Sequence, residues 1–523
     1  MFKPALAFAF SACLLGLAPA PAVARDTAPQ AVALANTKAA RDYYARLIAA
    51  PAPDLAELTL LMTLMPKGGD LHHHYSGAIY VEDYLDWLKL AGWCVYRADN
   101  AESGAARYHV ETRPRDQLPA AAGALCLDAD AIRDARNNDF YRGLLSRWSD
   151  KDYANHNHEQ PPPDAQFFNT FGYFGPVSTY NYNLALRNLK ARAQAENVQY
   201  IETMLRSAPA RAEVYGSAAG KQADALAPDA DQANVDAALA PLYDVLAADA
   251  HTRDDIAKYL SVLEDAAAGI DDDSFTMRFQ AYVSRNNPPA QVFAGLYAAF
   301  AATNRSAKSS GRLVGVNIVG PENWPVSMRD YTLHMRMFHF LRQKFPDVHL
   351  DLHAGELTLG MVPPEGLQSH IREAVEIAGA QRIGHGVDLP YEHDADSLLR
   401  TLREKNVALE INLTSNAFIL GVAGAAHPVQ VYRRHGVPFV ISTDDPGVSR
   451  DNLSHEYVLF ASRYKPAYDE LKRTVYNSIR HAFLTDAQKA AELQKLDTRF
   501  AAFEARVREL AASSARSTTR KTH

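Results

Sequence analysis

The 523-residue chain contains few cysteines, with three in total, and it has no long apolar run beyond its first two dozen residues. It also has no excess of positive charge, because 54 Lys and Arg stand against 61 Asp and Glu, for a formal net charge of -7. The chain therefore lacks the general basic surface that holds a nucleic-acid backbone. No Gly-rich phosphate fingerprint follows its first β-rich run. These absences argue against polynucleotide substrates and leave small nucleosides open.

The only long apolar run lies at the start of the chain and is typical of a secretory signal. Lys3 supplies a positive charge, "ALAFAFSACLLGLA" is the apolar segment, and "AVA" at residues 22–24 is a small-residue cleavage site. A membrane anchor is the alternative, but the run is short for a span. We therefore expect residues 1–24 to be removed and the mature protein to be periplasmic or secreted.

Removal of this signal leaves two cysteines, Cys94 and Cys126. In an oxidising compartment such a pair is expected to form a disulfide, with two buried reduced thiols as the alternative. The pair would staple an insertion at about residues 93–165. The polar composition of residues 100–165 predicts that much of this insertion is irregular.

Eight short β-rich runs follow one another along the chain, most of them separated by segments long enough for a helix. They are "GDLHHH", "VQYIETM", "FTMRFQAYV", "LVGVNIVG", "VHLDLHAGE", "RIGHGVDL", "VALEINL" and "PFVIST". This alternation predicts the α/β class and a (β/α)8 TIM barrel over residues 67–484, in preference to an open doubly wound sheet. We expect two helices within residues 25–66, and a C-terminal helix and disordered tail over residues 485–523.

The first of these runs ends in three histidines, His72, His73 and His74. Residues i and i+2 of a strand share a face, so His72 and His74 converge while His73 turns away. Such a pair can bind one Zn²⁺ through its ring nitrogens. Three further runs end in polar side chains, namely His353 and Glu356, His385, and Asp444 with Asp445. Because the carboxyl ends of barrel strands form the catalytic face, we expect these groups to meet.

This set of residues is chemically complete for metal-assisted hydrolysis. His72, His74, His353 and Asp444 make an N₃O ligand set for Zn²⁺ that leaves a position for water, and the metal lowers the pKa of that water towards about 7. Glu356 and His385 then remain free to move protons. We expect the glycines on either side of His385 to let a substrate ring approach the backbone closely.

The blocks "DLHHHYSGA", "LHAGE", "RIGHG" and "STDDP" resemble the four signature blocks of the adenosine deaminase family of amidohydrolases. "MPKGGDLHHH", the secretory signal, the cysteine-bearing insertion and "YNSIRHAFL" are most similar to its secreted branch, the adenosine deaminase-related growth factors. The resemblance runs from about Met65 to about Leu484. It implies zinc-dependent hydrolysis of adenosine, and of 2'-deoxyadenosine, to the inosine product and ammonia. It also implies a homodimer formed through residues 30–65.

The family's residue roles carry over by position. One Zn²⁺ per chain would be bound by His72, His74, His353 and Asp444, the last also counted among the catalytic residues. Glu356 would protonate purine N1, and His385 would take the proton of the metal-bound water. Asp445 would hydrogen-bond N7, and the backbone N–H of Gly320 in "NIVGPEN" would reach N3.

The chain departs from the family where an aspartate near the ribose is usual, because Tyr75 and Ser76 occupy those places. We expect these two residues to contact the sugar, and neither can make the same charge-assisted contact. Another 6-aminopurine or small heterocycle therefore stays open as the substrate, as does a catalytically inactive extracellular binding protein. Intact Glu356 and His385 disfavour the inactive protein, and the Cys-x-x-Cys motif of base-flipping polynucleotide deaminases is absent.

Overall fold

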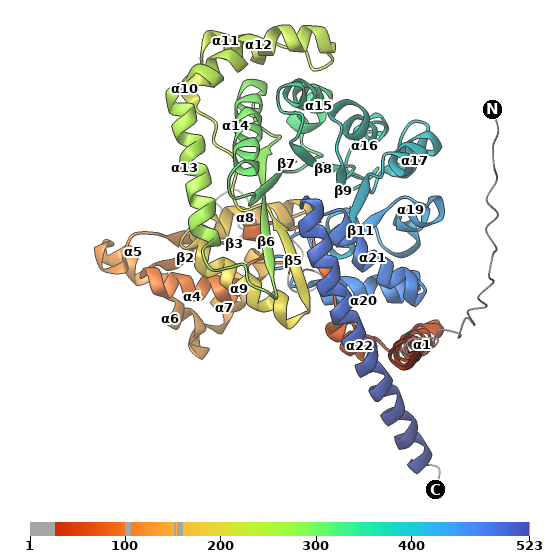
Figure 1. The fold of residues 1–523 in the computed structure, drawn as a ribbon. Helices are drawn as coiled ribbons and strands as arrows, with labels where there is room; N and C mark the ends of the chain where they lie inside the picture. Colours follow the sequence, from red (N-terminus) through yellow and green to blue (C-terminus); the bar gives the residue numbers. More distant parts are fainter. Residues whose placement is uncertain (1–26, 100–105, 151–152, 154–160, 522–523) are drawn as a thin grey trace, which may run out of the picture.

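The computed structural model describes residues 27–99, 106–150, 153 and 161–521. Its centre is a sheet of eight parallel strands in the order β1-β5-β6-β7-β8-β9-β10-β11 (Figure 1). The strands are β1 (Gly68–Asp70), β5 (Val198–Thr203), β6 (Thr276–Ser284), β7 (Leu313–Val319), β8 (His349–Ala354), β9 (Arg382–His385), β10 (Ala408–Ile411) and β11 (Phe439–Ile441). Six of them lie within their predicted runs, whereas β1 begins one residue before its run and β6 ends one residue after its run. The predicted (β/α)8 TIM barrel is confirmed.

The barrel closes beside the predicted metal site. A parallel bridge joins His73 to Asp444, where the amide of His74 donates to the Asp444 carbonyl at 3.0 Å and the amide of Asp444 donates to the His72 carbonyl at 2.9 Å. The strands are buried on both faces, as in β5, where all six residues are buried. Such continuous burial is expected of parallel strands covered by helices.

Helices cover the outside of the sheet (Figure 1). They include α9 (Tyr182–Ala195), α10 (Ala212–Tyr215), α11 (Ala218–Asp224), α12 (Gln232–Ala248), α13 (Ala250–Ala267), α14 (Pro289–Ala307), α15 (Pro325–Lys344), α16 (His370–Glu373), α17 (Ala395–Glu404), α18 (Leu413–Leu420), α19 (Val429–His435), α20 (Leu453–Tyr464) and α21 (Tyr468–Arg480). The connections from β6 to α14, from β7 to α15 and from β10 to α18 are short, so these strand ends are held on a rigid frame.

The segments at the two ends of the described chain lie side by side. The two helices predicted ahead of the barrel are α1 (Thr27–Ala49) and α2 (Leu55–Leu64), and α1 packs against α22 (Asp486–Lys521), where Thr37 Oγ1 donates to Glu504 Oε2 at 2.5 Å. The helix α22 is continuous as far as Lys521. The segment expected to be a disordered tail is therefore helical up to that residue. The expected signal at residues 1–24 lies outside the described residues. None of the described helices combines the length and the apolarity that a membrane crossing needs.

The insertion after β1 is a small module of regular elements. Strands β2 (Cys94–Asp99), β3 (Ala106–Glu111) and β4 (Cys126–Leu127) form an antiparallel sheet in the order β3-β2-β4. The helices around it are α4 (Val81–Ala91), α5 (Ala120–Leu125), α6 (Ala129–Arg133), α7 (Asn138–Trp148) and α8 (Pro163–Ser178). The predicted disulfide between Cys94 and Cys126 is present.

The expectation of an irregular insertion is therefore corrected. In this polar segment, Tyr108 and Val110 are two residues apart and therefore share one face of β3, which packs against the core. A strand needs an apolar residue only at every second position to pack on one side. A prediction from composition averages these positions with their charged neighbours and so misses the strand.

Candidate active site

The four predicted metal ligands meet at the carboxyl ends of β1, β8 and β11. The Nε2 atom of His74 lies 3.1 Å from Nε2 of His353 and 3.3 Å from Oδ1 of Asp444. The Nε2 atom of His72 lies 3.5 Å from the same Asp444 oxygen. In the group of His72, His74 and Asp444, the potential ligand atoms all lie within 4.8 Å of one another. Residues far apart in the sequence thus present nitrogen and oxygen donors to one point.

Neighbouring strands orient the imidazoles of this cluster. The Nδ1 atom of His72 lies 2.8 Å from Glu410 Oε2, and Nδ1 of His353 lies 2.8 Å from Asn317 Oδ1. Both Nε2 atoms therefore face the cluster. The Nε2 atom of His72 is buried and has no hydrogen-bond partner among the described residues. A buried, unpartnered ring nitrogen beside a carboxylate is what a metal ligand needs, so the donor set fits a divalent ion such as Zn²⁺.

Glu356 and His385, the two predicted proton carriers, lie beside the cluster. The Nε2 atom of His385 is 3.7 Å from Oε1 of Glu356, and Nδ1 of His385 is 3.0 Å from Nδ2 of Asn416. Burial, followed by the negative charge of Asp444, raises the pKa of Glu356 well above its ordinary value. Burial, followed by the charge on His72, lowers the pKa of His385 to about 3. Glu356 is thereby held as an acid while His385 is held as a neutral base.

Two of the predicted residues have backbones in the left-handed region. His385 has φ 71° and Asp444 has φ 61°, although neither is glycine. Side chains rarely tolerate this conformation, and such strain gathers at functional sites. The strained turns aim both side chains into the cluster at the ends of β9 and β11.

Asp445 is packed against the turn that follows the histidines. A Cβ atom on Gly77 would lie 1.5 Å from Asp445 Oδ1, so only glycine fits there. Burial, followed by the charge of Asp444, raises the pKa of Asp445 well above its ordinary value. Asp445 can therefore hold a proton at neutral pH and act as a hydrogen-bond donor.

The expectation for the glycines beside His385 is corrected. A Cβ atom on Gly384 would lie 2.5 Å from Cε1 of the His72 ring, and one on Gly386 would lie 2.6 Å from Cδ1 of Leu409. These glycines make room for the metal-facing imidazole and for the core. Neither of them lines the substrate cavity.

A cavity of about 290 Å³ opens from the cluster, within the range of a small-molecule site. Three of the four predicted substrate contacts, Ser76, Gly320 and Asp445, line it. Tyr75 is not among the lining residues, since its ring is buried and its hydroxyl donates to the Ser178 carbonyl at 2.8 Å. The placement of Tyr75 at the sugar is therefore corrected. Its ring packs at 5.3 Å from that of Tyr182, which also does not line the cavity.

Sequence reasoning missed a set of apolar residues that also line the cavity. They are Phe167, Phe168 and Phe171 of α8, together with Met204, Tyr282 and Trp324. The only sequence signal was "FFNTF", in which two phenylalanines are four residues apart and so share a helix face. That spacing is typical of core packing and does not indicate which face meets a ligand.

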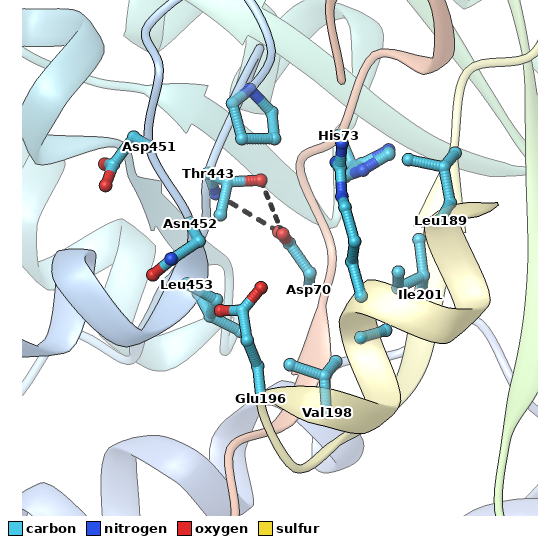
Figure 2. A pocket seen from close by; sticks show the side chains of 13 residues that line it. Asp70, His73, Leu189, Glu196, Val198, Ile201, Thr443, Asp451, Asn452 and Leu453 are labelled. Carbon is cyan, nitrogen blue, oxygen red and sulfur yellow. Dashed lines mark hydrogen bonds between the residues drawn. The ribbon is translucent and has the colours of Figure 1, made fainter. Parts of the chain in front are cut away.

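His73 turns away from the cluster, as predicted. Its Nδ1 atom lies 2.9 Å from Thr203 Oγ1, and the ring lines a separate small cavity of about 30 Å³. Asp70 and Glu196 point into this cavity, and Thr443 donates its hydroxyl to Asp70 at 2.6 Å (Figure 2). The space suffices for roughly a single water molecule.

Comparison with known proteins agrees with this geometry. The family model described as "Adenosine deaminase" matches residues 251–499. That segment belongs to the adenosine deaminase family. An adenosine deaminase of Escherichia coli (strain SMS-3-5 / SECEC) is 35% identical over 159 residues, which are 30% of this chain and 44% of that relative. The chain thus spans less than half the length of the curated relatives it matches.

A solved structure shares the fold of this chain. The apo structure of the N6-methyl-AMP deaminase from Arabidopsis thaliana superimposes with a TM-score of 0.50 and 16% sequence identity. The alignment covers 84% of this chain and 98% of that one. At this identity the likeness concerns the fold, and it extends over the N-terminal half that the family model does not match.

Proposed function

We propose that the protein is a zinc-dependent deaminase that converts adenosine, and 2'-deoxyadenosine, to the inosine product and ammonia. The observation that carries this proposal is the meeting of an N₃O donor set with a buried acid and a buried neutral histidine at one end of one cavity. Hydrolysis of an amino-substituted purine ring needs these three functions together.

His72, His74, His353 and Asp444 would hold the metal, which supplies an electrophilic centre and lowers the pKa of a bound water towards about 7. Glu356, protonated because it is buried, donates its proton to N1 of the purine as water adds at C6. His385, neutral at pH 7, accepts a proton from the attacking water. His385 then passes its proton to the amino group, which leaves as ammonia, and the hydroxyl on C6 gives its proton to Glu356 as the carbonyl forms.

The remaining contacts orient the purine. Protonated Asp445 donates a hydrogen bond to N7, and the backbone N–H of Gly320 reaches N3 from a segment with φ 101° that lines the cavity. Ser76 lines the same cavity and would contact the sugar. Together these contacts fix the ring so that C6 meets the metal cluster.

The test is turnover of a panel of adenosine, 2'-deoxyadenosine, adenine and N6-methyl-AMP by the zinc-loaded full chain and its Glu356→Gln variant. Release of ammonia is measured for the first three compounds, and release of methylamine is measured for N6-methyl-AMP. We expect turnover of the two nucleosides by the wild-type protein only. Turnover of another panel member without adenosine would indicate a different amidohydrolase. Zinc binding without any turnover would indicate the inactive binding protein.

We further propose that the protein acts in the periplasm or outside the cell. The disulfide between Cys94 and Cys126 supports this location, because disulfides persist in oxidising compartments. N-terminal sequencing of the mature protein should find a start near residue 25.

Exposed Leu34 and Leu60 on α1 and α2 support the expected homodimer through residues 30–65, which sedimentation analysis would test.

A further inference from the structure

The cavity has two chemically different ends. Its inner end consists of the buried groups His353, Glu356, His385, Asp444 and Asp445, together with the half-buried His74. Its outer end carries an aromatic wall, defined as Phe167, Phe168, Phe171 and Trp324. Trp324 is 50% exposed, which places this wall towards the cavity mouth.

The helix α8 holds most of the aromatic wall. Phe167 lies 5.3 Å from Phe168 and 6.0 Å from Phe171 between ring centroids, so the three rings form one continuous surface. The side-chain amide of Asn323 donates to Asp164 at 3.0 Å, which ties the start of α8 to the segment that carries Trp324. The wall is thus built from α8, beside β3, and from the loop after β7 (Figure 1).

No Lys or Arg is among the described residues that line the cavity. Arg206 follows β5 in the sequence but is not among the residues that line the cavity. Its guanidinium lies 6.0 Å from the centroid of the Tyr259 ring. A phosphate in this cavity would have no cationic partner among the described lining residues. Burying an unpaired charge is costly, so the cavity disfavours nucleotides.

If the inner end binds the purine ring, the sugar extends towards the mouth, and its 5' substituent is the part furthest from C6. The neutral polar groups on this side are Ser76 and Asn169, which suit the ring hydroxyls. The rings around the 5' position suit an apolar group. A thioether is favoured further, because sulfur makes attractive contacts with aromatic rings.

We infer that the cavity selects 6-aminopurine nucleosides whose 5' hydroxyl is replaced by an apolar thioether group, and that the aromatic wall sets this preference. The inference rests on the proposed deaminase function and adds to it the substrate class. Reactions that cleave a sulfonium nucleoside and leave a thioether on the sugar would supply such a substrate.

The experiment measures kcat/KM by ammonia release for adenosine, 5'-deoxy-5'-methylthioadenosine and AMP with the zinc-loaded full chain. We expect the thioether nucleoside to exceed adenosine by about 10-fold, the usual effect of one apolar group in a pocket, and AMP to be the poorest. Equal or better turnover of adenosine, or comparable turnover of AMP, overturns the inference and leaves the deaminase function standing. Turnover of none of them overturns the deaminase function itself.

Variants of the wall test its role. Trp324→Ser and Phe168→Ser should each lower the ratio of kcat/KM between the thioether nucleoside and adenosine by about 5-fold to 10-fold. Tyr173→Ser is the matched control, since Tyr173 is a half-buried aromatic residue of the same helix that does not line the cavity. An unchanged ratio in both wall variants overturns the assignment of the preference to the wall.

A binding measurement separates selection from chemistry. Calorimetric titration with inosine and with 5'-deoxy-5'-methylthioinosine uses nucleosides that cannot be deaminated again. We expect the thioether product to bind about 10-fold more tightly to the wild-type chain and the difference to shrink in Trp324→Ser. Equal affinities for the two products would contradict the inference, whatever the turnover rates.

Discussion

The inner end of the cavity takes its side chains from the ends of four barrel strands, whereas the aromatic wall comes from α8 and from the loop before α15. The inner groups are fixed by hydrogen bonds, such as those of His72 to Glu410 and of His353 to Asn317. The wall is held by ring packing and by one polar tie between Asp164 and Asn323. Chemistry thus sits on the rigid frame, and substrate choice sits on an element that can vary without disturbing it.

Loss of the acid at the inner end should have the largest effect. Glu356→Gln keeps the size of the side chain but removes the proton that it donates, so we expect kcat to fall by about 10²–10⁴-fold. Metal content, measured by atomic absorption, and inosine affinity should stay near wild type. A variant that loses its metal would show that Glu356 is a ligand and would remove the division of roles proposed for the inner end.

The inner end was the more predictable of the two regions. The periodicity of a strand placed His72 and His74 on one face, and the strand-end rule brought His353, His385 and Asp444 to them. Both arguments need only the local backbone and the topology of the barrel. Strands such as β7 and β11 could be located because buried parallel strands are often short apolar runs, whereas β1 (Gly68–Asp70) was located by the histidines that follow it.

The aromatic wall could not be predicted. The two phenylalanines of "FFNTF" that share a helix face fit core packing equally well, and only the position of α8 over the barrel mouth decides between the two. The prediction for Tyr75 was wrong in the opposite direction. Its position matches one where the family usually has an aspartate near the ribose, which suggested a contact with the sugar, but the turn into α3 (Tyr75–Ala78) buries its ring. Local patterns do not specify which side of a turn faces a cavity.

The disulfide offers a way to loosen the wall without touching the inner end. Replacing Cys94 and Cys126 by Ser opens a cross-link between positions 32 residues apart. Loop-closure entropy predicts a loss of about 3–4 kcal/mol in the free energy of unfolding, measured by chemical denaturation. We expect KM to rise while metal content and the kcat of the folded protein persist. Loss of metal at native conditions would show that the two regions are coupled.

The support beneath the inner end can be weakened separately. Glu410→Gln weakens the contact to Nδ1 of His72, and groups in this position usually change metal affinity by about 10–100-fold. Competition with a chelator measures this change. Glu392→Gln is the control, since Glu392 is also buried but accepts its hydrogen bonds from the amides of Ile371 and Arg372. Equal effects in both variants would point to a general loss of stability.

The smallest effect should come from the tie that holds the wall. Asp164→Ala removes the acceptor of the Asn323 amide at the start of α8, a hydrogen bond worth about 1 kcal/mol. Since the bond joins the two parts of the wall, KM for the nucleoside should rise about 5-fold, whereas kcat and metal content should not change. Asp139→Ala, at an exposed carboxylate of α7, serves as the matched control in steady-state kinetics. A fall in kcat with KM unchanged would mean that α8 acts on the reacting groups, and the separation between the wall and the inner end would then fail.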